Sequence, residues 1–242
     1  MTASIAEYDD AHLAEHYSWL SGGLSERMLE SERAFVARGI EPEGTRRALD
    51  LGAGRGYQSI PLARLGFDVV AVDPSPKLLA ELARDANGLA ITTKKDDILR
   101  YLTSAEPGFE LCVCVGDALT HLASFGDVYR VFREMRRILA PGGKVVLAFH
   151  EMGETLGGVD RFVPVHADET TIFTCFLEYA GDHVRVHDLV HRKIDGGWEI
   201  KKRVYRKLRL DGDWTKKRLA DLGFAVEAED AAPGTVSLVA RL

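Results

Sequence analysis

The chain has 242 residues, of which 46% are hydrophobic and 28% charged, and its formal net charge is -6. This length and composition predict a globular fold with one main hydrophobic core, and they exclude a disordered or low-complexity chain. The negative charge argues against a protein whose affinity for nucleic acid comes from neutralising many phosphates.

Nothing in the sequence indicates export or membrane contact. Apolar runs such as 145–149 fall far short of the roughly 20 residues that cross a bilayer. Residues 1–10 hold neither a positive leader nor an apolar stretch, so we expect a cytoplasmic protein. Cys112 and Cys114 alternate within an apolar segment, and with Cys175 they make an odd count, so we expect structural thiols and no metal site.

The first 46 residues are expected to form a helical cap over the main domain. Apolar residues recur at helical spacing before Gly22-Gly23 and again over 24–40. Tyr17 and Trp19 in this cap can close over a bound cation or substrate, because a cation is attracted to the face of an aromatic ring. Packing in the core explains both aromatic residues equally well.

From residue 47 onwards, strand and helix patterns alternate, which is typical of a parallel sheet with helical crossovers. The first helix closes at Gly66, the second begins with Ser75 as its N-cap followed by a first-turn proline, and the third covers about 127–139. The strands are expected at 48–51, 68–72, 89–93, 111–115 and 144–149.

After His150 the pattern changes to long strands separated by turns. Three strands are expected at 170–179, 183–191 and 198–210, and they predict a small antiparallel sheet inserted before a helix at 214–222. Two last strands, 224–229 and 235–241, are joined through Pro233-Gly234 and predict an antiparallel hairpin at the edge of the main sheet. We therefore divide the chain into a cap (1–46), a core (47–150), an insertion (151–210) and a C-terminal completion of the core (211–242).

A glycine-rich loop follows the first expected strand of the core. Asp50 stands near the end of that strand, and Gly52, Gly54 and Gly56 alternate before the helix. Glycines at a strand-to-helix turn let the backbone approach a ligand closely and adopt positive φ. The carboxylate favours a cationic or amino group and would repel a pyrophosphate. A plain structural turn remains the alternative for the glycines alone.

A second carboxylate, Asp73, ends the second expected strand. A carboxylate there can accept both hydroxyl groups of a ribose, as in nucleotide-binding folds generally. The dinucleotide fingerprint needs its third glycine at position 57, where this chain has Tyr57. The spacing therefore favours a single nucleoside over a nicotinamide dinucleotide.

These motifs together resemble those of the class I S-adenosylmethionine-dependent methyltransferases, over roughly residues 47–150 and more loosely to the C-terminus. The resemblance is carried by segments 50–56, 70–75, 96–98 and 139–144, in that order. It implies a doubly wound α/β fold: a Rossmann-like, seven-stranded, mostly parallel sheet whose last strand is antiparallel. It also implies S-adenosylmethionine as cofactor, with its methionine part beside the three glycines, its ribose on Asp73 and its adenine at Asp97-Ile98. The full set of expected cofactor contacts is Tyr17, Asp50, Gly52, Ala53, Gly54, Gly56, Tyr57, Asp73, Pro74, Asp97, Ile98, Val115, Gly116 and His121.

A finer resemblance lies in the segment 115–122, Val-Gly-Asp-Ala-Leu-Thr-His-Leu. It is similar to the corresponding loop of the glycine and sarcosine N-methyltransferases and of the amino-sugar N-methyltransferases, in which an insertion of this kind roofs the active site. Asp117 stands where asparagine is common in that group. N-methylation is therefore favoured only slightly over O-methylation. The loop lacks the Asn-Pro-Pro-Tyr motif of DNA amino-methyltransferases, so a nucleic-acid base is not expected as acceptor.

An acceptor hydroxyl or ammonium group must lose a proton before it can take a methyl group, so a nearby histidine or carboxylate helps. His121, His150 and Asp117 are the candidates for this catalytic role, although both histidines would also suit packing or surface positions. On the insertion, strand alternation puts Arg203 and Tyr205 on one face, and if that face is the covered one Arg203 can bind an anionic group of the substrate.

Trp19, Arg203 and Tyr205 are thus the candidate substrate contacts. The expected function is methyl transfer from S-adenosylmethionine to a small molecule, in a protein that forms a homodimer through the insertion. A nicotinamide-dependent oxidoreductase and a non-catalytic S-adenosylmethionine-binding protein remain the alternatives.

Overall fold

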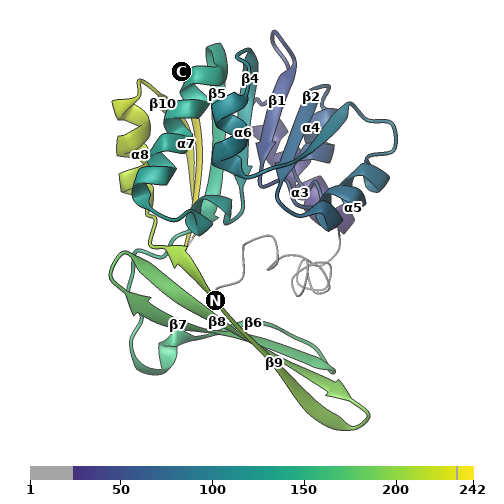
Figure 1. The fold of residues 1–242 in the computed structure, drawn as a ribbon, viewed down its shortest axis with the longest axis vertical. Helices are drawn as coiled ribbons and strands as arrows, with labels where there is room; N and C mark the ends of the chain where they lie inside the picture. The colour runs from purple at the N-terminus through teal and green to yellow at the C-terminus, as the bar shows by residue number, and fades with distance from the viewer. Residues whose placement is uncertain (1–23, 233) are drawn as a thin grey trace.

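The computed structural model describes residues 24–232 and 234–242. A seven-stranded sheet flanked by helices forms one body, and a four-stranded antiparallel sheet projects from one end of it (Figure 1). Within the described residues, no helix combines the length and the apolar character that a membrane crossing requires.

The large sheet has the strand order β10-β11-β5-β4-β1-β2-β3. Strands β1 to β5 pair in parallel, whereas β11 lies antiparallel between β5 and β10. This confirms the predicted mostly parallel sheet with a reversed C-terminal hairpin. The strands are β1 (Arg47–Leu51), β2 (Asp68–Asp73), β3 (Ile91–Lys95), β4 (Phe109–Val115), β5 (Leu139–His150), β10 (Ala225–Ala232) and β11 (Thr235–Arg241).

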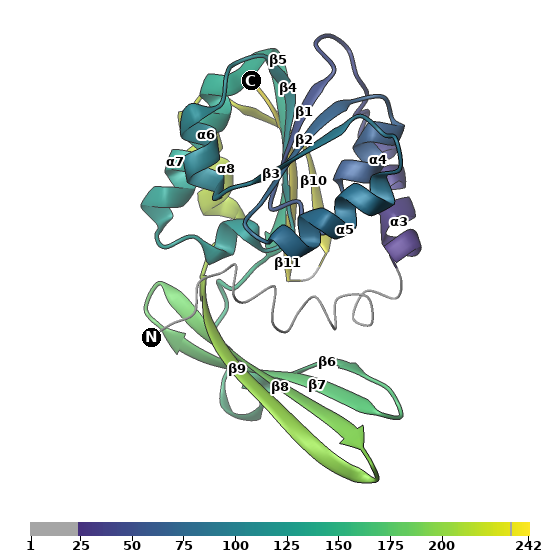
Figure 2. The same ribbon diagram turned by 45° about the vertical axis from the view of Figure 1, so that its right-hand side comes forward.

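Helices cover both faces of this sheet (Figure 2). One face carries α3 (Leu24–Ala37), α4 (Ser59–Arg64) and α5 (Pro76–Ala86), and the other carries α6 (Ile98–Ser104), α7 (Phe125–Ile138) and α8 (Gly212–Asp221). The central strands β4 and β5 are apolar on both faces because each face is covered, and side chains such as Phe132 and Leu147 are fully buried between the layers.

Local side-chain chemistry sets the helix ends. The Oγ of Ser75 accepts a hydrogen bond from the amide of Leu78 and caps α5, as predicted. Helix α7 begins two residues before its predicted start, because Ser124 accepts from the amide of Asp127 and serves as the N-cap. The third strand also lies two residues further along the chain than predicted, at Ile91–Lys95.

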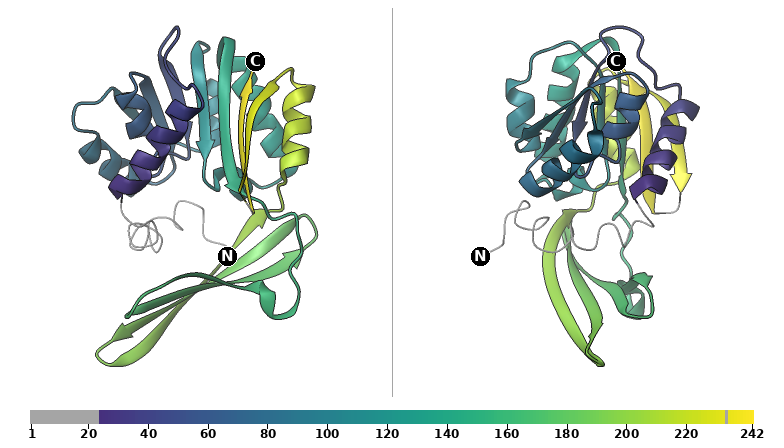
Figure 3. Two further views of the ribbon diagram at one scale, coloured as in Figure 1. Left: turned by 180° about the vertical axis from the view of Figure 1, so that it is seen from behind. Right: turned by 90° about the vertical axis from the view of Figure 1, so that its right-hand side faces the viewer.

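The insertion contains four strands, not the three that the sequence predicted. They are β6 (Phe162–Ala167), β7 (Thr171–Ala180), β8 (His183–Ile194) and β9 (Gly197–Leu208), arranged in chain order and preceded by the short helix η3 (Gly158–Arg161). Strand β6 was missed because it is short, contains Pro164 and is interrupted by a bulge, which is typical of an edge strand. Viewed from behind and from the side, the four strands twist strongly and extend away from the core (Figure 3).

Candidate active site

The carboxyl ends of β1, β2, β4 and β5 meet at the edge of the large sheet from which the insertion projects (Figure 1). In open α/β sheets, this is the edge where ligands bind. The loop after β1 and the end of β2 are joined there, because the amide of Gly54 donates to Asp73 Oδ2 at 2.8 Å. The amide of Ser75 donates to the other carboxylate oxygen, also at 2.8 Å. A carboxylate oxygen can accept more than one hydrogen bond, so a carboxylate at this position suits the hydroxyl groups of a ribose.

The three glycines of the loop differ in what surrounds them. All have positive φ, at +75° for Gly52, +52° for Gly54 and +87° for Gly56. A Cβ at Gly52 would lie 2.6 Å from the Cβ of Ala118, and one at Gly56 would lie 2.2 Å from a methyl carbon of Leu82. Among the described residues, a Cβ at Gly54 would meet no atom within 4 Å. Packing therefore requires two of the glycines, whereas the third, beside Asp73, is not covered by any of the residues that the structure describes.

A second open backbone position lies at the end of β4. Gly116 has a φ of +94°, and a Cβ there would also meet nothing within 4 Å in residues 24–232 and 234–242. Val115 before it is half-buried, and the short helix η2 (Ala118–His121) follows. Backbone groups are thus accessible on the loops after both β1 and β4, as a ligand cradle between these neighbouring strands requires.

Asp50, on β1, is a buried acid at the base of this cradle. Only 1% of its surface is exposed, and the hydroxyl of Ser59 donates to its Oδ2 at 2.6 Å. Burial raises the pKa of Asp50 to about 7; the negative charge of Asp73 adds to this rise, and the hydrogen bond from Ser59 opposes it. A cation bound in the loop would stabilise the charged form.

The other expected cofactor residues are spread around this edge. Ala53 and Tyr57 are buried in the loop and Pro74 is half-buried beside Asp73. The carboxylate of Asp97 caps α6 by accepting from the amides of Leu99 and Arg100, and Ile98 packs into the core. Tyr17 and Trp19 lie outside the described residues.

Asp117 connects its own loop, after β4, with the end of β5 and with β9. Its carboxylate accepts from the backbone amide of His150 at 3.0 Å and lies 3.0 Å from the ring Nδ1 of the same residue. Lys207 of β9 places its Nζ 2.5 Å from Asp117 Oδ2. Burial would raise the pKa of Asp117, but the hydrogen bond from His150 and the charge of Lys207 outweigh it and hold this pKa well below its usual range. Asp117 is therefore a fixed anion and a poor proton acceptor.

His121 lies beside this cluster, at the end of η2. Its ring centroid is 5.4 Å from that of Tyr205, and the ammonium of Lys207 lies 5.7 Å from the Tyr205 ring centroid. Burial and the positive charge of Lys207 lower the pKa of His121 to about 4, against the opposing effect of Asp117. The ring is therefore neutral near pH 7 and able to accept a proton.

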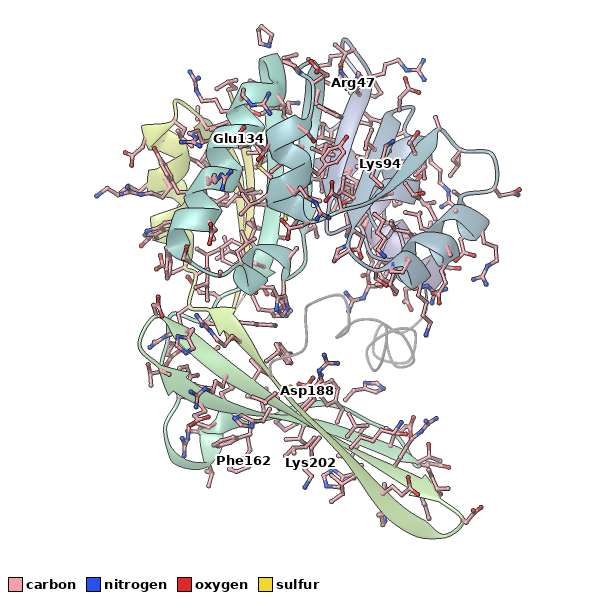
Figure 4. The ribbon with its side chains drawn as sticks, in the orientation of Figure 1. Arg47, Lys94, Glu134, Phe162, Asp188 and Lys202 are labelled. Carbon is pink, nitrogen blue, oxygen red and sulfur yellow. The ribbon has the colours of Figure 1, made fainter. Side chains whose placement is uncertain are left out.

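The inner face of the insertion combines buried apolar side chains, such as Leu177 and Val186, with a few polar ones. Arg203 stands directly opposite Asp188 in the pairing of β8 with β9, so both lie on the same face as Tyr205 and Lys207. Asp188 is buried and accepts a hydrogen bond from the thiol of Cys175 at 3.2 Å. Asp188 lies on the side of the sheet that faces the core, whereas Lys202 points away (Figure 4). Arg203 is accordingly half-buried on the inner face.

Lys207 was not among the residues singled out from the sequence. The signal was present, because positions 201, 203, 205 and 207 continue the alternation that puts Arg203 and Tyr205 on one face. Its partner Asp117 lies 90 positions earlier in the chain, so sequence spacing gave no hint of the ion pair.

Comparison with known proteins agrees with this geometry. Over 125 aligned residues the chain is 32% identical to a glycine/sarcosine N-methyltransferase of Aphanothece halophytica, covering 48% of this chain and 45% of that one. The chain spans about half the length of the first curated relatives it matches.

Two solved structures share the fold over nearly the whole chain. An S-adenosylmethionine-dependent methyltransferase from Clostridium acetobutylicum has a TM-score of 0.74 at 14% identity, covering 98% of both chains. An amino pentose methyltransferase from Micromonospora echinaspora has a TM-score of 0.70 at 19% identity, covering 100% of this chain and 98% of that one. The family model that describes a methyltransferase domain matches residues 48–143. Residues 48–143 of this chain are therefore similar to a methyltransferase domain.

Proposed function

We propose that the protein binds S-adenosylmethionine and transfers its methyl group to the amine of a small molecule. The observation that carries this proposal is the pairing of Asp73 with the open backbone at Gly54, which provides a ribose acceptor beside space for the rest of a nucleoside. The similarity of residues 48–143 to a methyltransferase domain and the named methyltransferase relatives support it.

The residues present fit this cofactor better than a dinucleotide. Asp50 is buried at the base of the glycine loop, where its charge favours an ammonium or sulfonium group and opposes a pyrophosphate. Tyr57, also buried, replaces the third glycine of the dinucleotide fingerprint. When bound, the cofactor supplies a methyl group already activated by the adjacent sulfonium. Asp73 and the loops at Gly54 and Gly116 would hold it.

The chain itself must orient the acceptor and take up its proton. We assign His121 as the proton acceptor, because its ring is neutral near pH 7 and lies beside Tyr205 of the insertion; its lowered pKa of about 4 makes it a weak base. Arg203 and Tyr205 lie on the inner face of the insertion and can contact the acceptor, Arg203 through an anionic group. An amine acceptor is supported by the glycine/sarcosine and amino-pentose substrates in the names of the similar proteins.

The direct test is a turnover assay with a panel of small amines and their hydroxyl analogues, in which S-adenosylhomocysteine formation is measured. We expect turnover with amines, and at least about tenfold less with the matched alcohols, which corresponds to about 1.4 kcal/mol in the barrier. Turnover of alcohols alone would reject N-methylation. Reduction or oxidation of substrates with a nicotinamide cofactor, without any methyl transfer, would reject the whole proposal.

We further propose a homodimer that forms through the insertion. The face of the four-stranded sheet that points away from the core exposes large apolar side chains, including Phe162, which lies on the same side as Lys202 in Figure 4. The exposed fractions are 51% for Phe162, 41% for Ile172, 51% for Trp198, 52% for Ile200 and 49% for Val204. Light scattering should show a dimer that Ile200→Glu converts to a monomer. A native chain that is monomeric at all concentrations would reject this interface.

We also propose that the protein works in the cytoplasm. Cys112, Cys114 and Cys175 are all free thiols, as expected for a reducing compartment such as the cytoplasm. The net charge of -6 supports a small-molecule acceptor over a nucleic acid.

A further inference from the structure

Lys207 is a buried lysine at the junction of the two sheets. It is 8% exposed and stands next to the last residue of β9, on the inner face of the insertion. Lysine is almost never buried without a partner, because its ammonium loses hydration there. The partner is Asp117, whose carboxylate oxygen lies 2.5 Å from the ammonium nitrogen. This ion pair ties the insertion to the loop after β4.

That loop carries the groups closest to the expected chemistry. Gly116 offers open backbone on one side of Asp117, and η2 carries His121 on the other. His150, at the end of β5, holds the same carboxylate through its backbone amide and its ring. Asp117 is therefore fixed from β5 and from β9 at once, and the position of the loop depends on both contacts.

The charged groups around His121 come from three elements. Asp117, in its own loop, favours a protonated imidazole ring, and so does a hydrogen bond with the backbone of Arg206 on β9. Lys207, also on β9, opposes protonation, as does burial. His150 of β5 acts on His121 through the carboxylate that it shares with Lys207. The net result is a pKa of His121 lowered to about 4.

We propose that Lys207 is a positioning residue for methyl transfer: its buried ammonium holds Asp117, and with it the loop that places the ring of His121, the proton acceptor of the proposed reaction. This inference rests on the proposed function. In the step concerned, the N–H bond of the acceptor ammonium breaks, its proton moves to a ring nitrogen of His121, and the electron pair stays on the amine nitrogen.

The test is an NMR titration of the histidine rings in the ligand-free protein, with the His121 signal assigned by comparison with His121→Asn. Lys207→Met removes the positive charge, and Lys202→Met is the matched control on the outer face of the same strand. We expect the titration midpoint of His121 to rise by about one pH unit or more in Lys207→Met and to stay unchanged in Lys202→Met. An unchanged midpoint in Lys207→Met, or an equal rise in the control, would overturn the proposal.

Two further variants separate electrostatics from folding. Lys207→Arg keeps the charge and should leave the midpoint within about 0.3 units of the native value, whereas Lys207→Gln should raise it as Met does, and serves if the Met variant does not fold. In turnover assays, Lys207→Met should lower kcat at pH 7 about tenfold or more even though it raises the pKa of His121, because the loop after β4 loses its contact with β9; the KM for S-adenosylmethionine should change less than about twofold. Because the titration needs no cofactor, a chain that titrates as expected but transfers no methyl group would reject the proposed function alone.

Discussion

The contrast between Gly54 and Gly56 gives a matched pair of alanine variants. Both residues have positive φ, so an alanine at either position costs about 1–2 kcal/mol of backbone strain. At Gly54 the added Cβ meets no atom of the described part of the chain within 4 Å, so we expect backbone strain to be the main cost. For a chain of this size, that lowers Tm by roughly 2–8 °C.

At Gly56 the same Cβ would lie 2.2 Å from a side-chain carbon of Leu82, which must move within a packed core. Overpacking of this kind adds about 1–3 kcal/mol, so Gly56→Ala should lower the unfolding free energy by roughly 2–5 kcal/mol in total. The two variants thus have similar strain and differ in what the new methyl group meets.

Ligand binding should be affected in the opposite order, with the larger loss of affinity in Gly54→Ala. In Gly54→Ala the methyl group takes space that we assign to the cofactor, and a loss of 1.4 kcal/mol or more would weaken binding about tenfold or more. Thermal unfolding and calorimetry with S-adenosylhomocysteine measure both properties on the same samples. Native affinity in Gly54→Ala, or a larger loss of stability there than in Gly56→Ala, would refute the assignment of this space.

Three further predictions concern titrating groups. Asp50 has a pKa of about 7 in the folded chain against 3.8 in the unfolded chain, so the folded state binds more protons in between and the ligand-free protein loses stability as pH rises from about 4 to about 7. Over this whole range the loss of unfolding free energy from this group is about 4 kcal/mol. Denaturant unfolding at pH 5 and pH 8 should therefore show Asp50→Asn becoming more stable, relative to the native chain, at the higher pH. An equal difference in unfolding free energy between the two proteins at both pH values would contradict this prediction. Burial raises the pKa of the Cys112 and Cys114 thiols, so a thiol reagent should label them only after unfolding. Rapid labelling of either thiol in the native protein would show that these side chains are not buried. His121→Asn should lower kcat about 10²-fold or more at pH 7 but much less at pH 10, where an amine acceptor has already lost its proton; a loss independent of pH would argue against a proton-accepting role.

Much of the fold could be predicted because its signals are local. The glycines after β1, the Ser75 cap and the Pro233-Gly234 turn signal are each visible within a few residues, so the succession of the core strands along the chain and the reversed C-terminal hairpin could be predicted. The order of the strands within the sheet is seen only in the structure. Strand β6 left no such local signal, because Pro164 and a bulge disturb the alternation that identifies strands. The shifted start of α7 shows the limit of apolar spacing where a serine cap decides the boundary.

The candidate site was less predictable, because it depends on contacts between distant segments. The carboxylates Asp50, Asp73 and Asp117 could be identified from their places at strand ends. Only the structure shows that Asp117 holds both His150 and Lys207. The role of Asp97 could not be decided from the sequence, because a carboxylate just before a helix can contact a ligand or cap the helix. In the structure its carboxylate caps α6.

The central claim is that a nucleoside sulfonium binds between β1 and β2, with Asp73 as its ribose acceptor. Calorimetry with S-adenosylhomocysteine and with NADH tests it on the native chain, on Asp73→Asn, and on Asp68→Asn, an exposed control at the start of the same strand. We predict one binding site for S-adenosylhomocysteine, about tenfold or greater weakening in Asp73→Asn, native affinity in Asp68→Asn and no binding of NADH. Binding of NADH, or native affinity for S-adenosylhomocysteine in Asp73→Asn, would contradict the claim.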